Sequence, residues 1–210
     1  MPPTKLDRMV RQRMTGRERR EQLIVIGRAA FAELGFDGAS VEEIAARAGV
    51  SKPVVYEHFG GKEGLYAVIV DREMLALEEV ITHSLSDGTW RERIEKATVA
   101  LLNYVEQETD GFLILVRDSK PGDERSYSTL LNSSLGQVSY ILGSAFERRG
   151  LDAKLAGLYA QALVGMVSMT AQWWLDTRQP AKEVVAAHIV NLCWNGLSGM
   201  EAKPKLRGTN

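Results

Sequence analysis

The chain has 210 residues, of which 45% are hydrophobic and 25% are charged, and its formal net charge at pH 7 is −1. This length fits one large or two small globular domains with a sizeable core, and the near-neutral charge excludes a general electrostatic attraction to nucleic acid. The single cysteine, Cys193, excludes an intrachain disulfide, and the N-terminal residues lack the apolar segment of a secretory signal, so we expect a cytoplasmic protein.

The first residues carry an excess of positive charge. Residues 1–20 contain seven Lys or Arg and two Asp or Glu, whereas residues 63–210 contain 15 basic and 19 acidic residues. A basic end on a near-neutral chain is typical of a local contact with phosphate. We therefore expect residues 1–14 to form a disordered basic arm that lies along DNA phosphates or in a minor groove. A solvated tail without a partner is the alternative.

A first helix is predicted from Thr15 to Leu34. Thr15 and Glu18 have the spacing of a capping box, in which each side chain accepts a hydrogen bond from a backbone N–H at the start of the helix. Gly35 follows and is expected to end the helix. Apolar residues recur on one face of this segment, at Leu23, Ile26, Gly27, Ala30, Phe31 and Leu34.

The stretch SVEEIAARAGVSKPVVYEHF, which begins at Ser40, has the pattern of a helix-turn-helix. Ser40 and Glu43 form a second capping box, and Gly49 ends the short helix with a left-handed residue. Ser51 caps a second helix, where Pro53 is tolerated because the first N–H groups of a helix lack intrahelical partners. Two short helices joined in this way place the second one in the DNA major groove.

The residues around this motif carry a family resemblance. The run from residue 27 to residue 66 includes the patterns L-G-F-x-x-x-S/T-V, I-A-x-x-A-G-V-S and Y-x-H-F-x-x-K-E-x-L. Over residues 16–66 the chain therefore resembles the N-terminal domain of the TetR (tetracycline-repressor) family of bacterial transcription regulators. The resemblance implies a three-helix DNA-binding domain at 15–61. It also implies a larger helical domain at 62–200 that binds a small molecule and pairs two chains.

The resemblance also implies which residues contact DNA. Lys52 would reach a base edge, for which guanine is the usual partner. Pro53 and Val54 stand where the family commonly has Gly and Thr, and Val54 cannot hydrogen-bond a base, so we predict that it contacts a thymine methyl group. Ser51 belongs to the same candidate face. Phosphate contacts are implied for Arg17, Ser40, Tyr56, His58 and Lys62.

The remainder of the chain is predicted to be all helical. Long stretches separate Pro53, Pro121 and Pro180, and no alternating run is bracketed by hairpin turns. Residues 62–200 then form one helical domain, and residues 201–210 form a disordered tail. We place helices near residues 62–84, 89–108, 111–117, 124–148, 152–177 and 181–197, which gives about nine helices in the whole chain.

The last two predicted helices are unusually apolar. No charged residue occurs from Leu155 to Leu175, a length that could cross a bilayer, but Gln161 and Gln172 favour a helix buried in protein. Two adjacent helices of this kind need cover on more than one face, so we predict a homodimer through a four-helix bundle. Candidate interface residues are Tyr159, Leu163, Met166, Thr170, Trp174, Val185, His188, Ile189 and Leu192.

The C-terminal domain contains no recognisable ligand motif. Aromatic and Met side chains with a few amides would suit an apolar or flat molecule, although each of them is more common as an ordinary core residue. Candidate lining residues are Tyr104, Phe112, Tyr127, Leu131, Gln137, Gln161, Met166 and Trp173.

Nothing in the sequence indicates an enzyme or a cofactor. The three histidines fall in separate predicted helices without metal-ligand spacing, and no phosphate-binding loop, dinucleotide fingerprint or nucleophile elbow occurs. The main hypothesis is a ligand-responsive repressor that binds a double-stranded, pseudo-palindromic operator as a homodimer and is released by a small, largely apolar molecule. Two alternatives stay open. One is an architectural DNA-coating protein without an inducer, and the other is a helical ligand-binding protein whose DNA-binding head is vestigial.

Overall fold

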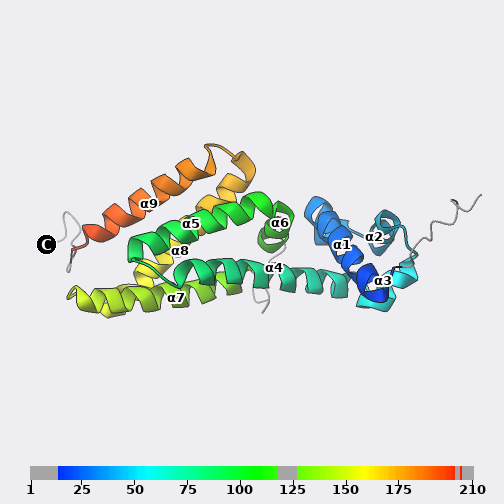
Figure 1. Cartoon of the computed structure of the whole chain (residues 1–210), viewed down its shortest axis with the longest axis horizontal. Coiled ribbons are helices and arrows are strands. Elements are labelled where there is room, and N and C mark those ends of the chain that lie inside the picture. Colours follow the sequence, from blue (N-terminus) through cyan, green and yellow to red (C-terminus); the bar gives the residue numbers. More distant parts are fainter. Residues whose placement is uncertain (1–13, 118–126, 202–203, 205–210) are drawn as a thin grey trace, which may run out of the picture. The chain divides into compact units, whose positions relative to one another are not determined.

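All regular structure in the computed structural model is helical over the residues that it describes, 14–117, 127–201 and 204 (Figure 1). Nine α-helices and one 3-10 helix lie in this part of the chain, which confirms the expected all-α class with an N-terminal helix-turn-helix domain and a larger helical domain. The chain divides into two compact units between Ile69 and Val70. The predicted arm and tail fall almost entirely outside the described residues.

The first unit contains three helices and the start of a fourth. They are α1 (Gly16–Gly38), α2 (Val41–Ala48), α3 (Lys52–Phe59) and the first residues of α4 (Lys62–Leu85). Their core is formed by fully buried apolar side chains, among them Leu23, Phe31, Ile44, Val55 and Leu65. The predicted boundary at residue 61 assigned all of α4 to the second domain, whereas the division between the compact units falls within α4.

The ends of α1 follow from its sequence, with one difference. The Thr15 N–H donates to Glu18 Oε2 over 2.7 Å and the Glu18 N–H donates to Thr15 Oγ1 over 3.2 Å, so the capping box is present. Gly35 has a φ of 72°, which breaks the helical backbone as expected. A further short turn then carries α1 on to Gly38, so the predicted end at Leu34 is four residues early.

One glycine in α1 permits a close helix contact. A Cβ atom added to Gly27 would lie 2.8 Å from Cδ2 of Leu65, and 3.2 Å from Cδ1 of Ile69. The absence of a side chain at Gly27 therefore lets α1 and the start of α4 pack more closely than two alkyl groups would allow.

The second unit contains the rest of α4 and five further α-helices. Figure 1 shows α7 lying along α8, and α5 along α9, and these two pairs make the most extensive contacts of the unit. Thr89 begins α5 with another capping box, since its hydroxyl accepts from the Glu92 N–H over 3.3 Å. The elements are α5 (Trp90–Gln107), α6 (Thr109–Arg117), α7 (Tyr127–Arg148), the 3-10 helix (Ala153–Leu155), α8 (Ala156–Thr177) and α9 (Lys182–Ser198).

The apolar segment that begins at Leu155 forms α8. No helix among the described residues combines the length and the apolar character that a bilayer crossing needs. Ala160, Ala171 and Trp174 are buried in the protomer, but Leu158 and Met169 are 66% and 63% exposed. A single chain therefore covers only part of the surface of α8.

Candidate DNA-binding face and apolar cavity

The turn between α2 and α3 has the geometry of a helix-turn-helix. Gly49 adopts the left-handed conformation with a φ of 64°, and the Val50 N–H donates to the Ala45 carbonyl over 3.0 Å, which closes the end of α2. Val55 on α3 is fully buried, so it anchors α3 against the rest of the unit. The residues that flank Val55 on α3 are consequently directed outward.

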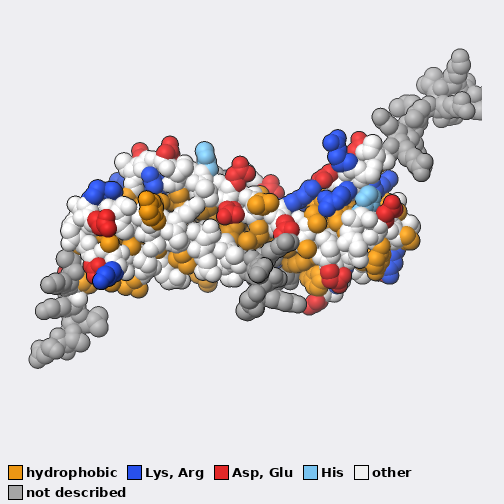
Figure 2. Space-filling view, turned by 90° about the horizontal axis from the view of Figure 1, so that it is seen from below, with side chains coloured by type: hydrophobic (Ala, Val, Ile, Leu, Met, Phe, Trp, Pro, Cys, Tyr) orange, Lys and Arg blue, Asp and Glu red, His pale blue; other side chains and the backbone are white. Residues whose placement is uncertain are grey.

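The predicted DNA-contacting residues lie on this outward side or at its edge. Figure 2 shows Lys and Arg side chains gathered on the first unit. Three of the predicted residues, Val54, His58 and Lys62, are only half-buried rather than fully exposed. The exposed ones are Arg17, Ser40, Ser51, Lys52, Pro53 and Tyr56.

Lys52, at the start of α3, is held by neighbouring groups. Its ammonium donates to a carboxylate oxygen of Glu42 on α2, and it lies 5.7 Å from the centre of the Tyr56 ring. The hydrogen bond raises the pKa of Lys52 and lowers that of Glu42, so both groups stay charged at neutral pH. Both side chains are exposed, and solvent screens a surface pair of this kind, so DNA can compete for the ammonium.

Lys62 has an internal role that the sequence did not indicate. Its ammonium donates to the carbonyl oxygens of Phe36 over 2.9 Å and of Ala39 over 3.1 Å. It also lies 4.4 Å from the centre of the Phe36 ring. These contacts tie the start of α4 to the end of α1 and to the residue that follows it. Because an ammonium has three donors, the predicted phosphate contact would depend on the remaining one.

Ser40 combines a capping role with the predicted phosphate contact. Its hydroxyl oxygen accepts from the Glu43 N–H over 3.1 Å, which leaves its proton available to an acceptor outside the helix. The expected reciprocal bond is replaced, because the Glu43 carboxylate accepts from Arg47 Nε over 2.8 Å. The predicted capping box at α2 is therefore only half formed.

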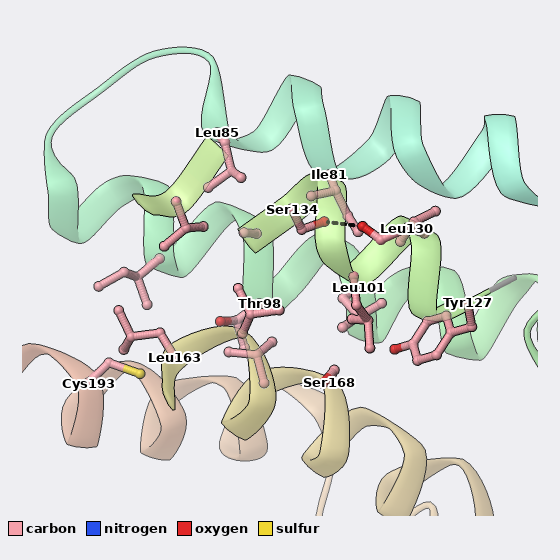
Figure 3. A pocket seen from close by; sticks show the side chains of 16 residues that line it. Ile81, Leu85, Thr98, Leu101, Tyr127, Leu130, Ser134, Leu163, Ser168 and Cys193 are labelled. Atoms are coloured by element: carbon pink, nitrogen blue, oxygen red, sulfur yellow. Dashed lines mark hydrogen bonds between the residues drawn. The ribbon is translucent and has the colours of Figure 1, made fainter. Parts of the chain in front are cut away.

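An apolar cavity of about 660 Å³ lies within the second unit (Figure 3). Part of this space is open to solvent, so the enclosed volume that a ligand can fill is smaller. Helices α4, α5, α7, α8 and α9 all contribute to its wall, and none of the lining side chains among the described residues is charged. The lining residues are Ile81, Leu85, Ile94, Ala97, Thr98, Leu101, Tyr127, Leu130, Leu131, Ser134, Val138, Leu163, Val164, Val167, Ser168 and Cys193.

Two of the four hydroxyl groups in the cavity wall bond to their own helices. Ser134 Oγ donates to the Leu130 carbonyl over 3.1 Å, and Ser168 Oγ donates to the Gly165 carbonyl over 3.2 Å. Thr98 is fully buried, and within the described part of the chain nothing lies at hydrogen-bond distance from its hydroxyl. The cavity therefore offers a ligand an apolar wall with little hydrogen-bonding capacity.

Two ionisable side chains in the cavity wall are kept neutral. Burial raises the pKa of the Tyr127 phenol to about 12, and the Gln172 side chain partly offsets this effect. Burial also raises the pKa of the Cys193 thiol to about 11. Neither group supplies charge at neutral pH, so the wall remains electrically neutral.

The structure brings only two of the predicted ligand residues to this cavity, Tyr127 and Leu131. Tyr104 and Phe112 are buried behind the wall, where Phe112 lies edge-on to Tyr127 with ring centres 5.6 Å apart. The assignment was wrong for Trp173, which is 49% exposed. Gln161 is also exposed, and Gln137 and Met166 are half-buried outside the lining.

The predicted dimer residues divide into buried and accessible groups. Trp174, Val185 and Ile189 are at most 7% exposed within the protomer, so they present little surface to a partner chain. Trp174 faces inward because its indole N–H donates to the Pro180 carbonyl over 2.8 Å. Leu163 lines the cavity instead. The accessible or half-buried members are Tyr159, Met166, Thr170, His188 and Leu192.

Family comparisons agree with both units. Residues 23–69 match the family described as "Bacterial regulatory proteins, tetR family", and residues 90–196 match "Tetracyclin repressor-like, C-terminal domain". The chain belongs to the TetR family of bacterial regulatory proteins. It is thus a DNA-binding transcriptional regulator and not an enzyme.

Individual TetR-family relatives cover most of the chain. The transcriptional activator FasR of Mycolicibacterium smegmatis is 28% identical over 183 residues, which is 86% of this chain and 84% of FasR. A TetR-like regulator from Rhodococcus sp. RHA1 has 25% identity and a TM-score of 0.71, covering 90% of this chain and all of that one. AibR, solved with isovaleryl coenzyme A and operator DNA, has 21% identity and a TM-score of 0.67, covering 83% of this chain and 97% of AibR.

Proposed function

We propose that this protein is a ligand-responsive repressor that binds a pseudo-palindromic operator as a homodimer and releases it when an acyl-type molecule enters the apolar cavity. The observation that carries the ligand class is the cavity wall, which has no charged side chain and whose Ser134 and Ser168 hydroxyls are bonded within their own helices. A hydrocarbon chain loses nothing by entering such a site, because it leaves no polar group of its own unpaired. The acyl coenzyme A bound by AibR supports the same class.

The cavity favours a long chain over a short one. Its wall on α7 extends from Tyr127 to Val138, and eleven residues of helix span about 16 Å. A short branched acyl group such as isovaleryl would fill only a fraction of that length. We therefore assign this protein a medium- or long-chain acyl ligand.

The proposed homodimer uses an exposed apolar stripe on α8 and α9. On α8, Leu158, Ala162, Met169 and Trp173 share one face, since they are separated by four, seven and four residues. On α9, Leu192 is 62% exposed and lies two turns after Val184, which is 43% exposed. A stripe of this kind is typical of an interface between chains. In the proposed interface, this stripe takes the place of the predicted residues that are buried in the protomer.

Helix α4 lines the cavity directly with Ile81 and Leu85, and a chain of contacts also connects the cavity to an earlier turn of α4. Tyr127 in the cavity wall lies edge-on to Phe112 of α6, and Phe112 lies edge-on to Tyr104 of α5 with ring centres 6.5 Å apart. The Tyr104 hydroxyl then donates to Glu73 Oε2 on α4 over 2.8 Å. Helix α4 continues from this point back to Lys62 in the DNA-binding unit. A ligand that displaces the Tyr127 ring would therefore act on α4 through three side-chain contacts.

The operator-bound dimer requires one position of α4. DNA is released if the ligand-bound second unit favours a different position of α4. The two recognition helices of a dimer must lie about one DNA turn apart, roughly 34 Å, to occupy successive major grooves. A change in this spacing loses contacts at both half-sites. A ligand that binds the DNA-free state a few kcal/mol more tightly than the DNA-bound state is therefore sufficient to release the operator.

The DNA-binding part of the proposal is tested by selection from genomic DNA. Purified protein is incubated with fragmented DNA of its own organism at two salt concentrations, and bound fragments are sequenced. We expect a short palindrome to be enriched and to persist at the higher salt. Uniform binding that disappears with salt would indicate backbone contact alone and would favour an architectural protein.

Activation is a second candidate for the regulatory effect. The relative FasR is named as an activator, and an operator upstream of the promoter would produce this effect with the same dimer and the same DNA contacts. A reporter driven by the selected promoter decides the sign. Repression predicts that deleting the regulator raises expression, whereas activation predicts that deletion lowers it.

A further inference from the structure

A second cavity of about 690 Å³ adjoins the apolar one along the same three helices. On α5, Ile94 lines the first cavity and Trp90 the second. On α7 the corresponding residues are Val138 and Leu142. On α9, Cys193 is followed four residues later by Leu197. Because a spacing of four residues is about one helical turn, the second cavity lies one turn further along each helix.

Only side chains separate the two cavities at α7. Val138 and Leu142 belong to one buried cluster, together with Leu85 and Phe146. Leu85 and Val138 line the first cavity, whereas Leu142 and Phe146 line the second. A single ligand that occupies both cavities would therefore require apolar side chains of this cluster to rotate.

The second cavity differs from the first in offering hydrogen-bond donors. Arg149 lines it, and two of its N–H groups donate to the carbonyls of Leu197 and Ser198 over long distances of 3.3 Å and 3.4 Å. A guanidinium has five donors, so three remain. Across the described residues, no carboxylate forms an ion pair with Arg149.

Two tryptophans add to this donor set. Trp90 Nε1 is buried, and over the described part of the chain no acceptor lies at hydrogen-bond distance from it. Trp194 also lines the cavity, and the Arg91 guanidinium lies 5.7 Å from the centre of its ring. The unpaired Trp90 N–H and the Arg149 guanidinium in the cavity wall are suited to an acceptor that carries negative charge, and the Arg91 guanidinium lies outside the lining against Trp194.

We propose that the second cavity holds the anionic head of the ligand whose hydrocarbon chain occupies the first. This inference rests on the proposed function, because it assumes that the apolar cavity binds an acyl chain. It assigns the ligand a single linear shape, with an apolar chain at the Tyr127 end and a carboxylate or phosphate at the Arg149 end. Arg149 would bind the anion, and Trp90 Nε1 would donate to the same head group.

Binding of three probes with one chain length tests this assignment. Dodecanoate, dodecanoyl coenzyme A and dodecanol are titrated into the wild type, Arg149→Gln and Arg148→Gln by calorimetry. Arg148 is the matched control, since it is an exposed arginine next to Arg149 that does not line the cavity. A charge-assisted hydrogen bond contributes about 1.5–3 kcal/mol, so Arg149→Gln should weaken the anionic probes about 10- to 100-fold. Dodecanol should bind all three proteins equally.

The outcomes separate this proposal from the function on which it rests. If the anionic probes bind the wild type and Arg149→Gln equally well, the head-group site is refuted while the acyl ligand stands. If no probe binds the wild type or changes operator binding, the proposed function itself fails. A loss confined to dodecanoate assigns a free carboxylate, and a loss for the coenzyme A ester assigns a phosphate-bearing head. Arg91→Gln should then weaken the ester as well.

Both variants are expected to fold, because both arginines are exposed. Trp90→Phe gives an independent test, since it removes the indole N–H and keeps an aromatic ring. It should weaken the anionic probes several-fold and leave dodecanol unaffected. Equal binding of all three probes by Trp90→Phe would remove Trp90 from the site.

Discussion

Replacing Thr98 with valine should stabilise the second unit. Thr98 is fully buried on α5, and its hydroxyl lies beside the apolar cavity with no partner among the described residues. A buried polar group that has lost its water costs about 1–3 kcal/mol, and valine has nearly the same shape without that group. We expect Thr98→Val to raise the free energy of unfolding by about 1–2 kcal/mol, and the Tm by roughly 2–4 °C for each kcal/mol in a chain of this size.

Urea unfolding followed by tryptophan fluorescence measures this change. The four tryptophans lie on α5, α8 and α9, so the signal reports on the second unit. Wild type, Thr98→Val and Thr98→Ser are compared at one protein concentration, and the dependence of the unfolding free energy on urea should be unchanged. Thr98→Ser keeps the hydroxyl and loses a methyl group, so it should be destabilised by about 0.8 kcal/mol. A valine variant no more stable than the wild type would show that the hydroxyl has a partner in solution, and the cavity would then be more polar than its wall suggests.

Four further substitutions test the DNA face, the route to α4 and the dimer. Lys52→Ala should weaken operator binding by about 1–3 kcal/mol, and Glu42→Gln should strengthen it by up to fivefold because it frees the Lys52 ammonium, as measured by fluorescence anisotropy. Tyr104→Phe, which removes the bond to Glu73, should reduce the ligand-induced loss of operator affinity by about 0.5–2 kcal/mol while ligand binding itself is retained; an undiminished response would exclude this route. Leu192→Asp should convert the dimer to a monomer in sedimentation experiments and abolish operator binding, and a dimer of unchanged mass would place the interface elsewhere.

The helices were predictable because their boundaries depend on neighbouring residues in the sequence. Thr15 with Glu18, and Thr89 with Glu92, form caps over three residues of chain, and the structure contains both pairs. Gly49 in the helix-turn-helix likewise has the left-handed φ that its position in the motif indicates. Local chemistry of this kind needs no knowledge of the tertiary fold.

The cavity could not be predicted in the same way, because its wall combines side chains from five helices. Thr98, Ser134 and Ser168 look like ordinary helix residues in the sequence, and only tertiary packing brings them together. The aromatic residues favoured by composition are mostly structural. Trp174 is buried while its neighbour Trp173 is exposed, and this difference depends on where α9 and the Pro180 carbonyl lie.

Lys62 illustrates a similar limit for the DNA-binding face. Its position in the family pattern indicated a phosphate contact, but the Phe36 and Ala39 carbonyls that accept its hydrogen bonds are more than 20 residues away in the chain. A motif specifies the residue type that a site needs. The structure adds the internal contacts that the same residue makes.

The most direct test of the central claim is operator binding measured with and without an acyl ligand. Fluorescence anisotropy with the selected palindrome, at one fixed salt concentration, gives the Kd of the dimer in the presence of increasing dodecanoyl coenzyme A or dodecanoate. The account predicts that one of these probes weakens operator binding at least tenfold. The effect should be half-maximal at a probe concentration near the Kd of the probe for the protein. Operator affinity that stays constant while the probe demonstrably binds would show that the apolar cavity does not control the DNA-binding unit.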